Sequence, residues 1–101
     1  MGPEARIERS VCSWAKKRGI TPLKLAGMHA RGQADRMFMK DGVAVFVEMK
    51  APGNKPTALQ AKWLADRRAD GFEATWHDNG EECKEWLTEK LLGGGGFSLD
   101  E

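Results

Sequence analysis

The 101-residue sequence contains no tyrosine, two cysteines and a formal net charge of only +1. Cys12 and Cys83 are too few for a disulfide framework or a cysteine metal site, and they favour a reducing compartment. No apolar run approaches the roughly 20 residues that cross a bilayer, and residues 1–10 lack the apolar segment of a secretory signal. We therefore expect a non-secreted, cytoplasmic domain. Any nucleic-acid binding would depend on a local basic patch, because the net charge does not indicate it.

Hydrophobic periodicity and turn residues predict the order α-β-β-β-α-β-α. Helices are expected at residues 3–18, 57–69 and about 79–91, and strands at 23–25, 34–40, 43–50 and 72–77. Thr57 is the expected N-cap of the second helix, with Leu59, Trp63 and Leu64 on its inward face. This order predicts an α/β (α+β) domain over residues 1–92, with a mixed sheet flanked by helices. Residues 93–101 are expected to form a flexible glycine-rich tail.

Asp41-Gly42 joins two strand-like segments and is typical of a two-residue hairpin turn, which needs positive φ at both positions. Lys40 then pairs with Val43, and the numbers of paired residues sum to 83. This register places Asp35 opposite Glu48 and Gln33 opposite Lys50. Two facing carboxylates repel each other, so this end of the hairpin requires a compensating cation. A β-bulge would change the register.

Asp35, Glu48 and Lys50 form the pattern D followed by E-x-K on the next strand. Convergent carboxylates are hard oxygen ligands that suit Mg²⁺ or Mn²⁺, and the backbone carbonyl of Met49 is a further candidate ligand. A divalent metal beside an ammonium group can activate water and stabilise negative charge on a phosphorane-like transition state. The grouping therefore suits phosphodiester hydrolysis. The three-residue pattern alone is weak, since solvated strand edges also carry such charges.

Several linked motifs make the pattern more specific. They are GQADR at 32–36, VFVEMKAPG at 45–53, KPTALQ at 55–60, EARIE at 4–8 and a helix ending at Gly71-Phe72. In this order and spacing they resemble the VRR-NUC (virus-type replication-repair nuclease) family of the PD-(D/E)XK nuclease superfamily. The resemblance covers residues 4 to about 77. It implies a restriction-endonuclease-like αβββαβ core, followed here by a C-terminal helix.

The resemblance also implies roles for individual residues. Asp35 and Glu48 match the metal-binding carboxylates, and Lys50 matches the catalytic lysine. Gln60 matches the glutamine that opens the helix after the E-x-K strand and helps to order the site. From the helix pattern alone, Gln60 would be an ordinary solvated residue.

Glu8 matches the acidic residue of the family's first helix, as a catalytic or metal-binding group, with Glu4 as the competing assignment. A simpler interpretation of Glu8 is a favourable charge near a helix N-terminus. Ala34 departs from the family, which usually has proline before the aspartate. Proline would stiffen the entry to the strand but would supply no ligand.

The sequence thus predicts a Mg²⁺- or Mn²⁺-dependent endonuclease that hydrolyses DNA. The resemblance to stand-alone viral members points to branched DNA such as a Holliday junction, to DNA repair in a bacterial or phage-infected cell, and to a homodimer. Four basic residues flank the proposed site and are candidates for phosphate contacts: Arg31, Arg36, Lys55 and Lys62. Two alternatives stay open, a non-catalytic DNA-binding or assembly subunit with the same fold and a nuclease that acts on RNA.

Overall fold

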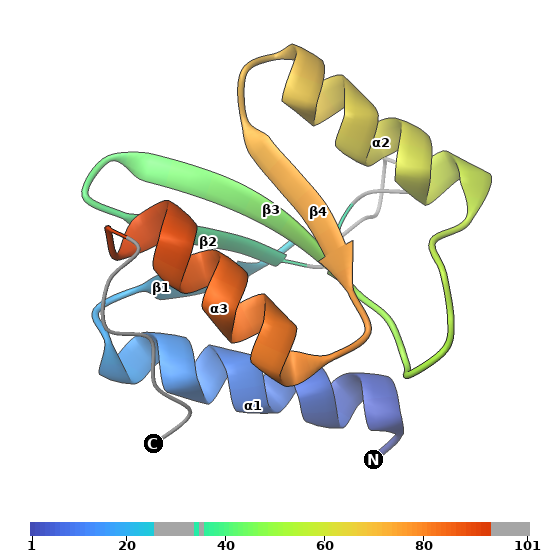
Figure 1. The fold of residues 1–101 in the computed structure, drawn as a ribbon, viewed down its shortest axis with the longest axis horizontal. Helices are drawn as coiled ribbons and strands as arrows, with labels where there is room; N and C mark the ends of the chain where they lie inside the picture. The colour runs from blue at the N-terminus through green and yellow to red at the C-terminus, as the bar shows by residue number, and fades with distance from the viewer. Residues whose placement is uncertain (26–33, 35, 94–101) are drawn as a thin grey trace.

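The computed structural model describes residues 1–25, 34 and 36–93 (Figure 1). Three helices and four strands follow one another along these residues. They are α1 (Pro3–Lys17), β1 (Thr21–Lys24), β2 (Arg36–Lys40), β3 (Val43–Met49), α2 (Ala58–Ala69), β4 (Glu73–His77) and α3 (Gly80–Leu91). The predicted order and the mixed α+β class are confirmed. None of the helices in the described ranges is both long and apolar enough to span a membrane.

The four strands form one sheet in the order β1-β2-β3-β4. The first three are antiparallel neighbours, whereas β4 runs parallel to β3 because α2 carries the chain back across the sheet. Helices α1 and α3 pack against each other on one side of the sheet, and α2 covers the other side (Figure 1).

The β2–β3 hairpin has the predicted turn and register. Asp41 and Gly42 both have positive φ, 51° and 82°, as the two-residue turn requires. Paired residues run from Lys40↔Val43 to Arg36↔Val47, so their numbers sum to 83 over the whole described ladder. The predicted pairs of Asp35 with Glu48 and of Gln33 with Lys50 involve residues outside the described ranges.

Alternation along β3 sends its side chains to two different layers. Val45, Val47 and Met49 are fully buried in the main core with residues of α1 and α3. Phe46 packs in the smaller cluster with Leu64 of α2. Because neighbouring residues of a strand face opposite ways, Glu48 lies on the α2 side of the sheet.

Two local predictions were wrong. β1 begins at Thr21 and includes Pro22, whereas the strand was expected to begin at residue 23; an edge strand tolerates proline because it has no partner on one side. Leu59 is 48% exposed instead of inward. It lies five residues before the buried Leu64, which at 100° per residue turns it roughly 140° away from that inward direction.

Candidate active site

Glu48 is a buried carboxylate near the C-terminal end of β3. It is 2% exposed, although Asp and Glu are rarely buried unless they are paired. Removing an ionised carboxylate from water carries a large cost, so hydrogen bonds and a nearby positive charge must stabilise it. Gln60 supplies a hydrogen bond to Glu48, and Lys50 supplies a nearby positive charge.

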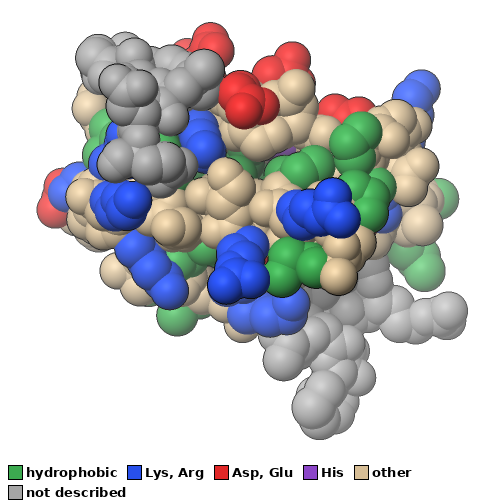
Figure 2. All heavy atoms as spheres, turned by 90° about the horizontal axis from the view of Figure 1, so that it is seen from below, with side chains coloured by type: hydrophobic (Ala, Val, Ile, Leu, Met, Phe, Trp, Pro, Cys, Tyr) green, Lys and Arg blue, Asp and Glu red, His purple; other side chains and the backbone are tan. Residues whose placement is uncertain are grey.

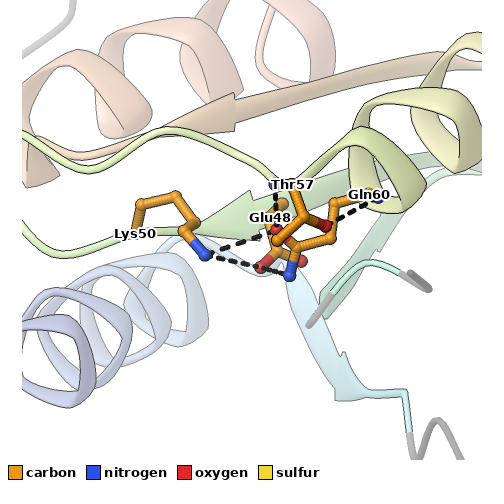
Figure 3. A network of polar contacts seen from close by, with 4 residues as sticks. All are labelled: Glu48, Lys50, Thr57 and Gln60. Atoms are coloured by element: carbon orange, nitrogen blue, oxygen red, sulfur yellow. Dashed lines mark hydrogen bonds and ion pairs between the residues drawn. The ribbon is translucent and has the colours of Figure 1, made fainter. Parts of the chain in front are cut away.

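Gln60, in the first turn of α2, is hydrogen-bonded to Glu48 (Figure 3). Its Nε2 donates to Oε2 of Glu48 at 3.0 Å. Its Oε1 accepts from the backbone N–H of Thr57 at 2.8 Å and from Nζ of Lys50 at 3.3 Å. The amide orientation is therefore determined, because one end must donate and the other must accept.

Thr57 fixes the position of Gln60 through the N-cap of α2. Oγ1 of Thr57 accepts from the backbone N–H of Gln60 at 3.2 Å, while the Gln60 side chain accepts from the Thr57 backbone, which forms a reciprocal capping box. Thr57 was predicted only as a helix cap. The T-x-x-Q spacing was the sequence signal that could have linked this cap to the site.

Lys50 brings the positive charge to the network. Its Nζ lies 3.9 Å from Oε2 of Glu48, and its side chain is only 14% exposed. The backbone N–H of Lys50 donates to the carbonyl of His77 at 2.9 Å, so the chain continues along β4 after β3 ends. The following loop is bonded to the same end of β4, where Oδ2 of Asp78 accepts from the backbone N–H of Gly53 at 2.9 Å. These bonds hold the lysine backbone beside the sheet.

The structure thus brings Glu48, Lys50 and Gln60 together, as the resemblance implied, and Glu48 has the chemistry to hold a divalent cation. Glu48 offers a hard oxygen donor, the kind that Mg²⁺ and Mn²⁺ prefer. Among the described residues, no three His, Cys, Asp or Glu side chains form a metal-binding cluster. Asp35, the second predicted carboxylate, lies outside the described residues. The Met49 side chain is in the core, and the role of its carbonyl stays a prediction.

Glu8 lies in a different set of contacts. Its Oε2 accepts from Nε of Arg36 at 2.5 Å and lies 3.7 Å from Nζ of Lys24. Arg36 pairs directly with Val47, whose side chain is in the core beside α1 and α3. Glu8 therefore lies on the sheet side opposite to Glu48. Its role as a ligand stays a prediction, as does that of the exposed Glu4.

The predicted phosphate-binding residues have different surroundings. Arg36 is paired with Glu8, as described. Lys62 is exposed and pairs with Asp66 at 2.9 Å along α2. Lys55 is exposed in the loop before α2. Arg31 lies outside the described residues.

Comparison with known proteins identifies the fold of the chain. The chain matches no protein-family model. A solved structure of a VRR_NUC domain superposes with a TM-score of 0.77, covering 88% of this chain and 97% of that one at 22% sequence identity. The chain therefore has the fold of a VRR_NUC domain, and the resemblance seen in its motifs is confirmed at the level of the fold.

A curated sequence is also similar to the chain. It is the protein named "Putative nuclease p44" from Acyrthosiphon pisum secondary endosymbiont phage 1, which is 38% identical over 60 residues. The match covers 58% of this chain and 64% of that protein, so the two are similar over less than two thirds of the relative's length.

Proposed function

We propose that the chain is a metal-dependent endonuclease that hydrolyses DNA phosphodiester bonds. The observation that carries this proposal is the buried Glu48 carboxylate, bonded to Gln60 and close to Lys50. A nuclease site needs a carboxylate and a cation side by side, whereas a strand that served only structure would place an apolar residue at so buried a position. The VRR_NUC fold and the name of the similar phage protein agree with this function.

In this proposal Glu48 and Asp35 would hold Mg²⁺ or Mn²⁺, with the Met49 carbonyl as a further candidate ligand, while Glu8 is paired with Arg36 on the other side of the sheet. The bound ion supplies Lewis-acid chemistry, which activates water and offsets the negative charge of the transition state. The Lys50 ammonium donates a hydrogen bond to the attacking water or to a phosphate oxygen. The water oxygen would form a bond to phosphorus and release a proton to solvent, the bond to the leaving oxygen would break, and that oxygen would take up a proton from solvent.

Gln60 serves as a positioning residue in this scheme. Its N–H holds one Glu48 oxygen, and its carbonyl oxygen accepts from Lys50, so one amide sets the geometry of both groups. Partners that orient a metal ligand commonly change metal affinity or activity by 10–100-fold when they are removed. Gln60 is also anchored by the helix cap at Thr57, which restricts its motion.

The proposed substrate is branched DNA, such as a Holliday junction, cut by a homodimer during DNA repair. A domain of this size offers a small surface for a duplex, and two copies related by a two-fold axis would present two sites to a symmetric junction. The phage origin of the similar protein agrees with this setting.

The test is cleavage of a labelled four-way junction, a flap, a linear DNA duplex and an RNA duplex, with Mg²⁺, Mn²⁺ or EDTA. Asp35→Ala, Glu48→Gln and Lys50→Ala are compared with the parent protein. Lys90→Ala is the matched control, since Lys90 pairs with Glu73 and Glu89 away from the Glu48 network. We expect metal-dependent cutting of the junction that only the first three changes abolish. Calorimetric titration with Mn²⁺ should show weaker binding to Glu48→Gln.

Two results would contradict the proposal. Tight junction binding without cutting under every metal condition would indicate a DNA-binding or assembly subunit. Cutting confined to RNA would leave the chemistry in place and change the substrate class.

A further inference from the structure

A basic hollow lies between α1 and the start of β2, on the opposite side of the sheet from Glu48. Its volume is about 470 Å³, and its lining includes Arg9, Ser13, Lys16, Lys17 and Arg36. We call these five residues the α1 basic surface. Figure 2 views the molecule from the side on which α1 lies and shows Lys and Arg side chains gathered across it, with acidic side chains toward one edge.

Two of the four cations on the α1 basic surface, Arg9 and Lys16, are not neutralised by neighbouring carboxylates in the described part of the chain. Glu8 is the acidic residue in the lining, and it is already paired with Arg36 and Lys24. Within the described parts of the chain, no carboxylate forms an ion pair with Arg9 or Lys16. A chain with a net charge of +1 thus presents a concentrated positive field on one side.

Helix electrostatics explain only part of this pattern. Lys16 and Lys17 lie in the last turn of α1, where the helix dipole favours cations. Arg9 lies in the middle of the helix, where the dipole offers no such stabilisation. Arg9, Ser13 and Lys16 recur at spacings of four and three, so they lie along one helical face.

We infer that the α1 basic surface binds the phosphodiester backbone of the nucleic acid that the protein cuts. This inference rests on the proposed function and adds a second contact region to it. Arg9 and Lys16 are separated by seven residues, or about 10 Å along the helix. A DNA duplex carries one negative charge per roughly 1.7 Å of its axis, so about six phosphates fall within that length.

Arg36 connects this surface to the strands that carry the site. Its side chain lines the hollow, and its backbone pairs with Val47, the residue directly before Glu48. The hollow and Glu48 therefore share one end of the hairpin but lie on opposite sides of the sheet, so this surface would hold a part of the substrate away from the bond that is cut. Because the contacts go to phosphates, they would position the substrate without reading its sequence.

The test measures binding separately from cleavage. Fluorescence anisotropy with a labelled 30-base-pair DNA duplex, in EDTA and at several NaCl concentrations, gives the slope of log affinity against log salt. Lys16→Gln is compared with Lys90→Gln, since each lowers the net charge from +1 to 0. The double variant Arg9→Gln/Lys16→Gln removes two positive charges and should therefore change the salt slope more than Lys16→Gln does. Arg9 and Lys16 are both exposed, so we expect the variants to fold like the parent protein. Circular dichroism measures whether they do.

We expect Lys16→Gln to reduce the magnitude of the salt slope by about 0.9 and the double variant by about 1.8. At 0.1 M NaCl each lost contact should weaken binding roughly eightfold. Lys90→Gln should bind like the parent protein. Its cleavage rate should also equal that of the parent, because Lys90 lies outside the α1 basic surface and the Glu48 network.

The outcomes separate this inference from the proposed function. A parent protein that cuts DNA, with equal salt slopes in Lys16→Gln and Lys90→Gln, would overturn the inference and leave the nuclease proposal standing. A lower slope in Lys16→Gln with no cleavage by the parent would support the inference and contradict the nuclease proposal. If the double variant lost self-association in light scattering while its DNA affinity stayed the same, the surface would bind the acidic side of a second copy, and the inference would be wrong.

Discussion

Nε2 of Gln60 donates to Oε2 of Glu48 at 3.0 Å, which joins the first turn of α2 to the end of β3. The same side chain closes the capping box of its own helix through its other end. One amide therefore connects helix initiation with the orientation of the candidate metal-binding carboxylate. Changes that affect its two ends differently can separate stability from activity.

The change Gln60→Glu keeps the capping end of the side chain and alters the end that contacts Glu48. A glutamate at this position still offers an oxygen to the Thr57 backbone N–H, as glutamates commonly do in capping boxes. It loses the N–H group that donates a hydrogen bond to Glu48, and it places a second carboxylate next to the Glu48 carboxylate. We expect cleavage of the labelled junction to fall by about 10–100-fold, with a higher Mg²⁺ concentration needed for half-maximal rate.

Gln60→Ala is the companion change, since it removes both ends and should also lower the free energy of unfolding by about 1 kcal/mol. Urea denaturation measures that difference. Gln60→Glu cutting at the parent rate would show that the hydrogen bond to Glu48 has no part in the reaction.

Thr57→Ala and Asn79→Ala form a matched pair of helix-cap changes. Oγ1 of Thr57 accepts from the N–H of Gln60 in α2, and Oδ1 of Asn79 accepts from the N–H of Glu82 in α3. Each change should lower the free energy of unfolding by about 1 kcal/mol. Only Thr57→Ala should slow cleavage, because only its helix carries Gln60. Equal cleavage rates in the two variants would mean that the α2 cap stabilises the fold without ordering the site.

The sequence was informative wherever local geometry decides the structure. Asp41-Gly42 determined the turn, and the turn determined the register as far as Arg36↔Val47. That register and the burial of Val47 and Met49 explain why Glu48 projects toward α2. The motif around Glu48 and Lys50 depends on a two-residue strand period, which is why it could be interpreted without a structure.

Tertiary packing decided what the sequence could not. Nothing local distinguishes Leu59 from Leu64, yet only Leu64 is buried, because the sheet contacts one side of α2. The ion pair between Glu8 and Arg36 joins residues 28 positions apart, so no sequence window contains both. The capping box around Gln60 could have been predicted from the T-x-x-Q spacing. The hydrogen bond from Gln60 to Glu48 could not, because it depends on how α2 crosses the sheet.

A double-mutant cycle on Glu8 and Arg36 measures the energy of their pairing. The side chains are only 12% and 20% exposed, so the pair is less screened than a surface ion pair. We expect Glu8→Gln and Arg36→Gln each to lower the free energy of unfolding by about 1–2 kcal/mol. The coupling energy should reach at least about 0.5 kcal/mol. Additive effects would show that the contact contributes nothing to stability.

The same Glu8→Gln variant tests the predicted ligand role. Since Glu8 and Glu48 lie on opposite sides of the sheet, the contacts of Glu8 favour an effect on stability over one on metal binding. We therefore expect Mn²⁺ affinity in calorimetry to stay close to that of the parent. A loss as large as that in Glu48→Gln would instead assign Glu8 to the metal.

His77 should make stability depend on pH. Its ring packs against Trp86 with centroids 6.0 Å apart, and burial lowers the pKa of His77, although Glu82 and Asp78 oppose the shift. The unfolded chain, with a histidine pKa of about 6.5, then binds the proton more readily than the folded one. The stability that His77 contributes is therefore complete above about pH 6.5 and is lost as pH falls toward the lower, folded pKa. Urea denaturation at pH 8 and pH 5 should show a larger loss in the parent protein than in His77→Phe, whose carboxylates still titrate. An equal loss in both would mean that His77 titrates alike in the folded and unfolded chains.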